Sequence, residues 1–402
     1  MSIKRNGTIE LYSIALVLLL ISNICFYTAE TMPLYLLMSV SGSLLSFAVS
    51  LRRFSMVIKK YNCILWLTAV YGMFMFYGHF FLRAGIFPSA SLLSRYLENI
   101  AFYLAIKGIF REDYRKLAPS FMVAGVFSLL YLIAQEGTVI ALGGSRIGDS
   151  LSGNVNTTGL SFGILSTVVI WSYCMDRKRI KLLLFAALLL FMILSGSKKV
   201  TIVIVADLFL ILAYRKGKVS TWIFLAIGLA VGIYCIFNIP YLYEIMGIRI
   251  ESMFLTMLYG DSASLYSYST ELREIMVEEA FRLSRDHPIF GGGYNYFFAK
   301  TVTQYDYCHC NYAELLCNFG VVGTLLFYSK HLSNLKTFVK ELRRGTENRD
   351  LTVFGVVIVL LGMLLDWGAV TFSSLPQWYL PVLLSSAAVD TIRSSGRPNG
   401  RR

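Results

Sequence analysis

The sequence HPIFGGGYNYF, residues 287–297, lies in a long polar stretch that interrupts an otherwise apolar chain between about residues 240 and 311. A second polar sequence, CHCNYAELL at 308–316, leads from this stretch into the next apolar run. One large charged, glycine-rich and aromatic loop among apolar segments is typical of a membrane protein that works in that loop. We therefore expect the other segments to form a helical scaffold that holds the loop at one membrane face.

The composition is that of a membrane protein. The chain has 402 residues, 56% of them hydrophobic, and a mean hydropathy of +0.61, which is too apolar for a soluble globular protein. Apolar runs of about 17–22 residues recur along it, each long enough to cross a hydrocarbon core of roughly 30 Å. They predict an all-α polytopic membrane protein with about twelve transmembrane helices. The runs lie near 11–29, 32–50, 63–82, 91–108, 117–135, 157–174, 180–196, 199–214, 219–239, 312–329, 351–372 and 376–392.

The first run lacks a small-residue cleavage site, so we expect it to remain as a span and not to be removed as a signal peptide. Basic residues cluster in alternate connections between the runs, which is the pattern of the positive-inside rule. This alternation predicts that both termini are cytoplasmic and that the 240–311 loop and the 136–156 connection are extracytoplasmic. It also accounts for the net charge of +13 without a nucleic-acid partner. The basic clusters lie near 4–5, 52–60, 107–116, 177–181, 215–218, 330–349 and 393–402.

The predicted topology divides the chain into three parts. Residues 1–239 form an N-terminal transmembrane bundle of about nine helices. Residues 240–311 form the extracytoplasmic loop, with short amphipathic helices, because the apolar residues of 269–286 recur at helical spacing. Residues 312–402 form about three further transmembrane helices and a basic cytoplasmic tail.

Several basic residues fall in outer connections or at the outer ends of spans, where topology does not require them. Guanidinium groups match phosphate oxygens in bidentate geometry, so a pyrophosphate at the outer leaflet is the predicted partner. Ordinary salt bridges within the loops are the alternative interpretation. These residues are Arg146, Lys198, Lys199, Arg273, Arg282 and Arg285.

His309 is the best candidate for acid–base chemistry, because imidazole titrates near neutrality. It lies at the outer mouth of the tenth predicted span, beside Asn311 and Tyr312. The flanking Cys308 and Cys310 invite a metal interpretation, but a Cys-His-Cys tripeptide is too tight for one tetrahedral site without distant partners. We therefore expect neither a metal nor another cofactor.

Charges inside the predicted spans are costly and often functional. Arg95 and Glu98 are three residues apart in the outer half of the fourth span, where they can line an outward-facing cavity. A self-satisfied structural pair is the alternative, because residues at this spacing can pair on a helix. For Asp207 and Asp366, contacts between helices are at least as good an explanation as catalysis.

Three segments together resemble the O-antigen ligase/polymerase family, which comprises Wzy-type glycan polymerases and their lipid A-core ligase relatives. SRIGDSLSGNVNTTGLS at 145–161 is similar to the family's Arg-containing outer loop, which runs through a polar Asn segment into a span. LSGSKK at 194–199 resembles its Ser-Gly-Ser-basic signature between two spans. The most specific resemblance combines Arg273, HPIFGGGYNYF and HCNYAELLCNFGVVG at 309–323. In the family, an Arg is followed along the chain by Pro-Leu-Phe-Gly-x-Gly, then by His-Asn-x-Tyr-Leu-Glu-Leu and then by Gly-x-x-Gly, and these segments are similar to that order.

Some positions fit the family pattern closely and others depart from it. Arg282 and Gly293 satisfy the Arg-x10-Gly spacing described for polymerase outer loops. Cys310 stands in place of the usual first Asn, Lys198 stands where Arg is common, and the Arg146 loop lacks that spacing. These departures leave polymerase and ligase open.

The resemblance implies metal-independent, inverting glycosyl transfer on the outer face of a bacterial cytoplasmic membrane, as in O-antigen, capsule or exopolysaccharide synthesis. The donor is an oligosaccharide or glycan linked to undecaprenyl pyrophosphate, and the acceptor is the non-reducing sugar of another lipid-linked repeat unit. Besides these substrates and membrane lipid, the expected partners are a chain-length regulator and a flippase.

Within the reaction that the resemblance implies, the chemistry of the individual side chains indicates their roles. Catalysis falls to Arg146 and Arg273, which would neutralise the pyrophosphate leaving group, and to His309, which would take the proton from the acceptor hydroxyl. The remaining candidates are assigned to substrate binding, with the glycines allowing close approach of the backbone. They are Arg95, Glu98, Asn156, Lys198, Arg282, Gly291, Gly293, Asn311 and Tyr312.

Three other functions remain possible interpretations. A ligase of the same family would move finished glycan to a terminal acceptor such as lipid A-core or a cell-wall polymer. A polysaccharide flippase or another transporter would show inverted repeats and polar sites at the membrane midplane, whereas here the polar groups concentrate outside. A sensor or scaffold with an outer binding loop would leave the Arg/His combination unexplained.

Overall fold

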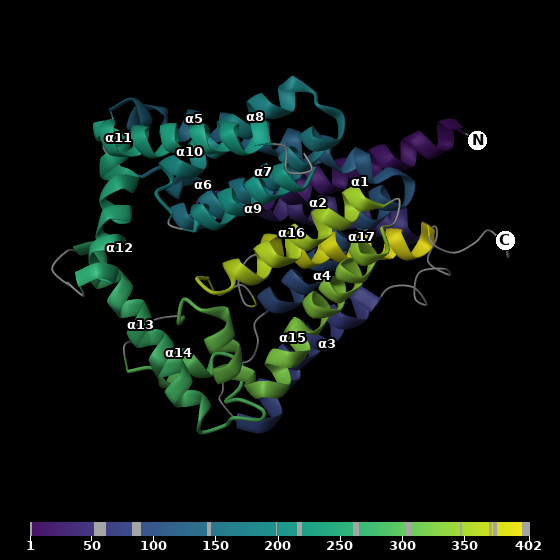
Figure 1. Ribbon diagram of the computed structural model, residues 1–402. Helices are drawn as coiled ribbons and strands as arrows, with labels where there is room; N and C mark the ends of the chain where they lie inside the picture. Colours follow the sequence, from purple (N-terminus) through teal and green to yellow (C-terminus); the bar gives the residue numbers. More distant parts are fainter. Residues whose placement is uncertain are drawn as a thin grey trace.

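The computed structural model describes residues 2–51, 62–82, 90–142, 146–197, 199–214, 219–259, 265–302, 307–345, 348–369, 372 and 376–395. Within these ranges the chain forms helices and no strand, and a helix coincides with each apolar run that the sequence predicts as a span. The helices are α1 (Ser2–Cys25), α2 (Met32–Leu51), α3 (Asn62–Leu82), α4 (Ala90–Asp113), α5 (Leu117–Leu142), α6 (Asp149–Ser152), α7 (Val155–Asp176), α8 (Arg179–Leu194), α9 (Val200–Tyr214), α10 (Val219–Asn238), α11 (Pro240–Leu242), α12 (Ile248–Tyr259), α13 (Leu265–Ser284), α14 (Tyr296–Lys300), α15 (Asn311–Arg344), α16 (Arg349–Leu365) and α17 (Leu380–Ser395) (Figure 1).

The all-helical membrane class is confirmed by helices that are long and apolar enough to cross a bilayer. Among the described residues there are 5 such runs, one of which contains both α4 and α5. A sixth arises if Ala226–Asn238 and Pro240–Ser252, which meet at 91°, form one broken span. Other predicted spans, such as α8 and α9, are shorter than the roughly 20 residues that a simple crossing needs. The number twelve and the cytoplasmic placement of both termini therefore stay predictions. The 5 runs are Gly7–Cys25, Met32–Leu51, Leu92–Thr138, Val155–Asp176 and Asn311–Arg344.

Packing joins early and late helices into one bundle. Helix α1 lies against α2, α4 and α5, while α16 packs on α9, α15 and α17. Between α7 and α16, Trp171 stacks on Phe354 with ring centroids 4.0 Å apart, and both side chains are fully buried. Aromatic pairs of this kind add to the van der Waals packing that holds helices together in a bilayer.

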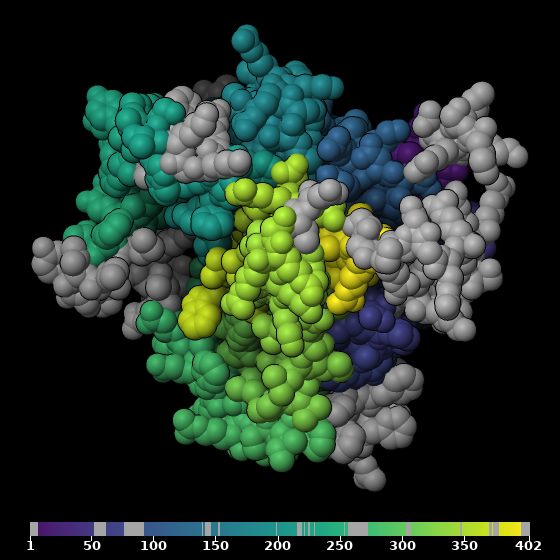
Figure 2. Space-filling view, turned by 45° about the vertical axis from the view of Figure 1, so that its right-hand side comes forward, coloured from purple at the N-terminus to yellow at the C-terminus, as the bar shows by residue number. Residues whose placement is uncertain are grey.

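The outer loop and the connections that carry candidate residues meet at one end of this bundle. Helices α5 and α8 end there, and α15 begins there. Helices α12 and α13 follow each other along one side of the molecule, from α11 to the start of α15 (Figure 1). The segment α13–α14 packs on α15 near its first turns, as the adjoining green and lime surfaces of Figure 2 show.

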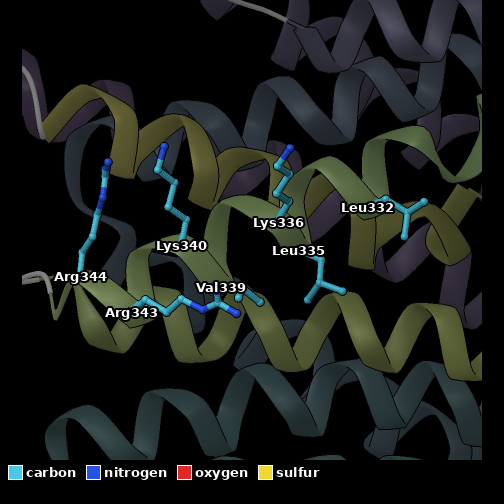
Figure 3. Close-up of a pocket in the computed structure, with 7 residues that line it drawn as sticks. All are labelled: Leu332, Leu335, Lys336, Val339, Lys340, Arg343 and Arg344. Carbon is cyan, nitrogen blue, oxygen red and sulfur yellow. The ribbon is translucent and has the colours of Figure 1, made fainter.

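A basic groove marks the opposite end of α15. It encloses about 610 Å³ beside Lys336, Lys340 and Arg343. Figure 3 shows Lys336 and Lys340 pointing to the same side of the helix. Because a helix rises 1.5 Å per residue, this groove lies roughly 40 Å along α15 from His309. It is therefore separate from the candidate site described next.

Candidate active site

Arg146 is held against the turn between α8 and α9. Its Nε donates to the carbonyl oxygen of Ser195 across 2.7 Å, and its Nη2 donates to Asn156 Oδ1 across 2.8 Å. Arg146 and Asn156, which the sequence predicts separately as a catalytic and a substrate-binding residue, are thus brought together. The buried carboxylate of Glu136 accepts the backbone N–H groups of Gly148 (2.7 Å) and Ser150 (2.8 Å), which fixes the loop that carries the arginine.

A second arginine, Arg249 of α12, reaches the same turn. Its Nη1 lies 3.5 Å from the carbonyl oxygen of Gly196. Gly196 has a φ of 61°, and a Cβ there would lie 3.0 Å from both Arg146 Nε and the carbonyl oxygen of Ile245. A glycine is therefore needed where the two arginines and α12 converge. Sequence reasoning did not single out Arg249.

Lys199, Arg273 and His309 extend this positive region from the turn to the start of α15. Burial first, and then the charges of Arg273 and Lys199, lower the pKa of His309 to about 4. Lys199 lies beside the end of α16, because a Cβ on Gly368 would be 3.1 Å from its Cε. In the described part of the chain, neither Lys199 nor Arg273 forms an ion pair with a carboxylate. We call Arg146, Lys199, Arg249 and Arg273 the cation cluster.

His309 is presented by a tight turn. Its φ of 61° is left-handed, which is unusual for a residue with a side chain. The preceding N–H, of Cys308, donates to Glu314 Oε2 across 2.9 Å, and the Cys308 thiol donates to the Cys310 carbonyl oxygen across 3.0 Å. The Tyr307 ring centroid lies 4.3 Å from that of His309. Such strained residues persist where the surrounding structure fixes them, often at active sites.

The comparison with protein families agrees with this geometry. Residues 182–328 match the family model of the O-antigen ligase. The resemblance seen in the sequence is therefore confirmed over this segment. The O-antigen ligase match runs from α8 into α15 and contains Lys199, Arg249, Arg273 and His309, whereas Arg146 precedes it. It indicates membrane glycosyltransferase-type activity on lipid-linked glycans. No curated protein matches the chain.

Within the O-antigen ligase segment, the three consecutive glycines dock onto α15. Gly291 has a φ of 73°, and a Cβ there would lie 2.2 Å from the backbone nitrogen of Phe319. Gly293 has a φ of 100° and donates its N–H to the carbonyl oxygen of Asn318 across 2.7 Å. Opposite them, Gly320 breaks the helix with a φ of 62° and a ψ of −167°. The close approach that the sequence predicts for these glycines is thus made to α15, and substrate contact by Gly291 or Gly293 stays a prediction.

Asn311 and Tyr312 fasten the start of α15 to its neighbours. Asn311 is fully buried, donates from Nδ2 to Tyr328 Oη (3.0 Å) and accepts the N–H of Phe372 at Oδ1 (3.1 Å). The hydroxyl of Tyr312 donates to the carbonyl oxygen of Met363 across 2.8 Å. Both side chains therefore hold the turn of His309 in place, whatever further contact they make with a substrate.

Arg282 lies on the exposed face of α13. Its side chain is 61% exposed, and its Nη2 is 3.5 Å from Glu279 Oε1. Glu279 also accepts the hydroxyl of Thr301 across 2.7 Å. Arg282 is thus not brought into the cation cluster by these contacts, and its substrate-binding role stays a prediction. Lys198, the other predicted substrate-binding cation, lies outside the described residues.

Arg95 and Glu98 belong to a polar network among α1, α2 and α4. Glu98 is 2% exposed, and its carboxylate accepts from Asn23 (2.6 Å), Ser39 (2.7 Å) and Tyr35 (2.8 Å). Arg95 donates to Tyr27 Oη across 3.2 Å. The contacts of Glu98 favour the structural interpretation for this carboxylate, since three donors already satisfy it inside the bundle. The two acids inside other predicted spans also form hydrogen bonds between helices. Asp207 accepts one from the hydroxyl of Thr167, and Asp366 accepts one from the hydroxyl of Tyr328.

Proposed function

We propose that this protein polymerises oligosaccharide repeat units linked to undecaprenyl pyrophosphate, on the outer face of the cytoplasmic membrane. The observation that carries this proposal is that Arg146 and Arg249 bond to the turn between α8 and α9 while the charges of Lys199 and Arg273 act on His309. Lys199, Arg249, Arg273 and His309 lie within the segment that matches the O-antigen ligase family. A bound pyrophosphate is the kind of anion that such a set of guanidinium and ammonium groups recognises. The reaction is an inverting transfer in which the acceptor hydroxyl displaces the pyrophosphate from the anomeric carbon.

The cation cluster stabilises the leaving group. As the bond between the anomeric carbon and the phosphate oxygen breaks, negative charge grows on the lipid pyrophosphate. Arg146 and Arg249 are already oriented by the carbonyl oxygens of Ser195 and Gly196, so they need little reorganisation at that moment. Arg273 and Lys199 add charge from the side of His309.

His309 acts as the general base. A pKa of about 4 keeps the imidazole neutral at pH 7, so a ring nitrogen can accept the proton of the acceptor hydroxyl. A base with so low a pKa is weak, but the bound pyrophosphate offsets the charges of Arg273 and Lys199. Since nearby negative charge favours the imidazolium, the donor itself strengthens the base.

The lipid tail has an apolar groove beside the cluster. A groove of about 320 Å³ runs between α9 and α16 and is lined by residues such as Val205, Phe209 and Leu360. Its outer end includes Thr201 and Leu364, close to where Lys199 meets the end of α16. A polyprenyl chain in this groove would place its pyrophosphate at the cation cluster.

A ligase that moves finished glycan to a terminal acceptor uses the same donor and the same chemistry. We favour the polymerase because Arg282 and Gly293 keep the Arg-x10-Gly spacing of polymerase outer loops. A flippase or other transporter is the less favoured alternative, because the cations lie at one end of the bundle and not at its midplane.

The proposal is tested on the surface glycan of a strain that lacks the protein and is complemented with variants. We expect His309→Ala and Arg273→Ala to give single repeat units where the wild type gives a ladder. Lys300→Ala removes an exposed cation of the same loop that has no predicted role; it is the matched control and should restore the ladder. Each variant must reach the membrane at the wild-type level. Polymer that accumulates on its lipid carrier would establish the ligase instead, and an unchanged glycan in the deletion would exclude both reactions.

A further inference from the structure

A further groove lies between α1 and α5, at the end of the bundle away from the cation cluster. Its lining comes from residues 9–18 and 116–123, and it encloses about 830 Å³. Farther along the same two helices, the Cys25 thiol donates to Ser128 Oγ across 3.1 Å, so α1 and α5 run in parallel. Because α5 spans 26 residues, its first turn is roughly 39 Å from the loop that carries Arg146.

The groove is charged at one end and apolar along the rest. Glu10 and Lys116 are both exposed and line the same end, and they form no ion pair with each other among the described contacts. One to two turns deeper, Ile14 is 50% exposed and Val123 is 54% exposed. The charged side chains lie where the headgroup of a membrane lipid would lie, and the apolar side chains lie where its acyl chains would lie.

Ser120 gives an independent indication of a ligand. Its side chain is 2% exposed and lines the groove, yet its Oγ has no hydrogen-bond partner in the described part of the chain. A serine inside a helix commonly bonds to the carbonyl oxygen four residues earlier, which this one does not. A buried hydroxyl without an acceptor is costly, so an acceptor supplied by a bound molecule would stabilise the site.

We propose that this groove binds a zwitterionic aminophospholipid of the phosphatidylethanolamine type. The primary ammonium of the headgroup pairs with Glu10, the phosphate pairs with Lys116, and an ester oxygen accepts from Ser120. The acyl chains lie along Ile14 and Val123. An anionic headgroup such as that of phosphatidylglycerol has no ammonium and would place negative charge beside Glu10. The quaternary ammonium of phosphatidylcholine has no N–H to donate to Glu10. The site is separate from the proposed glycan chemistry and does not depend on it.

The test compares lipid headgroups on the purified full-length protein. Native mass spectrometry is run in detergent with equal amounts of phosphatidylethanolamine, phosphatidylglycerol and phosphatidylcholine carrying the same acyl chains. We expect the wild type to retain phosphatidylethanolamine about fivefold over either competitor, the effect of one favourable ion pair. Equal retention of the three lipids, or preference for phosphatidylglycerol, would overturn the proposal.

Variants separate the headgroup contacts from general stability. Glu10→Gln should shift the preference toward phosphatidylglycerol, because Lys116 then remains without a competing carboxylate. Lys116→Gln should weaken the binding of both phosphatidylethanolamine and phosphatidylglycerol. Ser120→Ala should lower lipid retention without changing the order in which the three headgroups are preferred. Glu30→Gln and Lys178→Gln, exposed charges elsewhere, are the matched controls and should retain wild-type selectivity. Unchanged selectivity in Glu10→Gln, at an unchanged melting temperature without lipid, would contradict the assignment of the headgroup.

Discussion

The backbone N–H of Cys308 lies 2.9 Å from Glu314 Oε2, so the first turn of α15 holds the residue before His309. Glu314 is 5% exposed, and its carboxylate is fixed by the helix that carries it. His309 adopts its left-handed φ of 61° directly after this bond. The orientation of the proposed base therefore depends on a carboxylate that does not itself need to reach the substrate.

Removing this carboxylate should slow transfer with little effect on donor binding. Leaving the buried N–H of Cys308 without an acceptor costs about 1–3 kcal/mol, so Glu314→Ala should lower kcat about 5- to 100-fold. Glu314→Gln keeps an acceptor oxygen and should recover most of the activity. The measurement is kcat and KM for a lipid-linked donor with the protein in nanodiscs. Full activity of Glu314→Ala would show that the turn of His309 does not need this bond.

The pH dependence should report the lowered pKa of His309. Only the neutral imidazole accepts a proton, so kcat/KM should be constant from pH 8 to about pH 6 and fall as the pH decreases through about 4. Bound pyrophosphate raises the pKa of His309, so the acid limb of kcat should lie at higher pH than that of kcat/KM. Matched pH profiles of both constants check this. An acid limb of kcat/KM near the ordinary histidine value of about 6.5 would argue against the burial of His309 beside Arg273 and Lys199.

Arg249 should behave as a ligand of the donor pyrophosphate. Loss of a charge-assisted hydrogen bond costs about 1.5–3 kcal/mol, so Arg249→Ala should lower kcat/KM about 10- to 100-fold. Arg249→Lys keeps the charge and should lose less. The control is Lys300→Ala, which removes an exposed cation of the same loop. If Arg249→Ala and Lys300→Ala have equal kinetic constants, Arg249 has no part in donor binding.

Much of the helical scaffold could be predicted because the signal is local. Runs of apolar residues and the alternation of basic clusters depend on the chain alone, and helices coincide with the predicted runs. The sequence also predicted a site formed by the segments of Arg146, Arg273 and His309; the charge of Arg273 acts on His309 in the structure, and the catalytic roles of all three stay predictions. The count of complete spans could not be tested in the same way, since α8, α9, α16 and α17 are each shorter than 18 residues.

The finer contacts could not be predicted, because they depend on how distant helices pack. Arg249 joins the cluster because the π-helical segment Tyr243–Gly247, which precedes α12, lies against Gly196 through the carbonyl oxygen of Ile245. Gly291 and Gly293 read as a substrate-binding loop, yet their nearest backbone is that of α15. The sequence predicts Asn311 at the mouth of a span, and Glu98 either lining a cavity or forming a structural pair; both are buried and bonded within the bundle. The local sequence around a polar residue near the end of a span does not show whether its side chain will contact a substrate or bond within the bundle.

Alanine substitutions at two glycines with similar φ angles should distinguish the effect of backbone strain from the effect of close packing. Gly291 (φ 73°) would place a Cβ 2.2 Å from the Phe319 nitrogen, whereas Gly153 (φ 65°) has nothing within 4 Å of its Cβ position. Backbone strain alone costs about 1–3 kcal/mol, so Gly153→Ala should lower the melting temperature modestly. Gly291→Ala adds a clash with fixed backbone, so it should destabilise the protein further and displace the loop from α15. Thermal unfolding monitored by tryptophan fluorescence, with proteolysis of the outer loop, measures both effects. Equal losses in the two variants would mean that the loop does not dock on α15 as described.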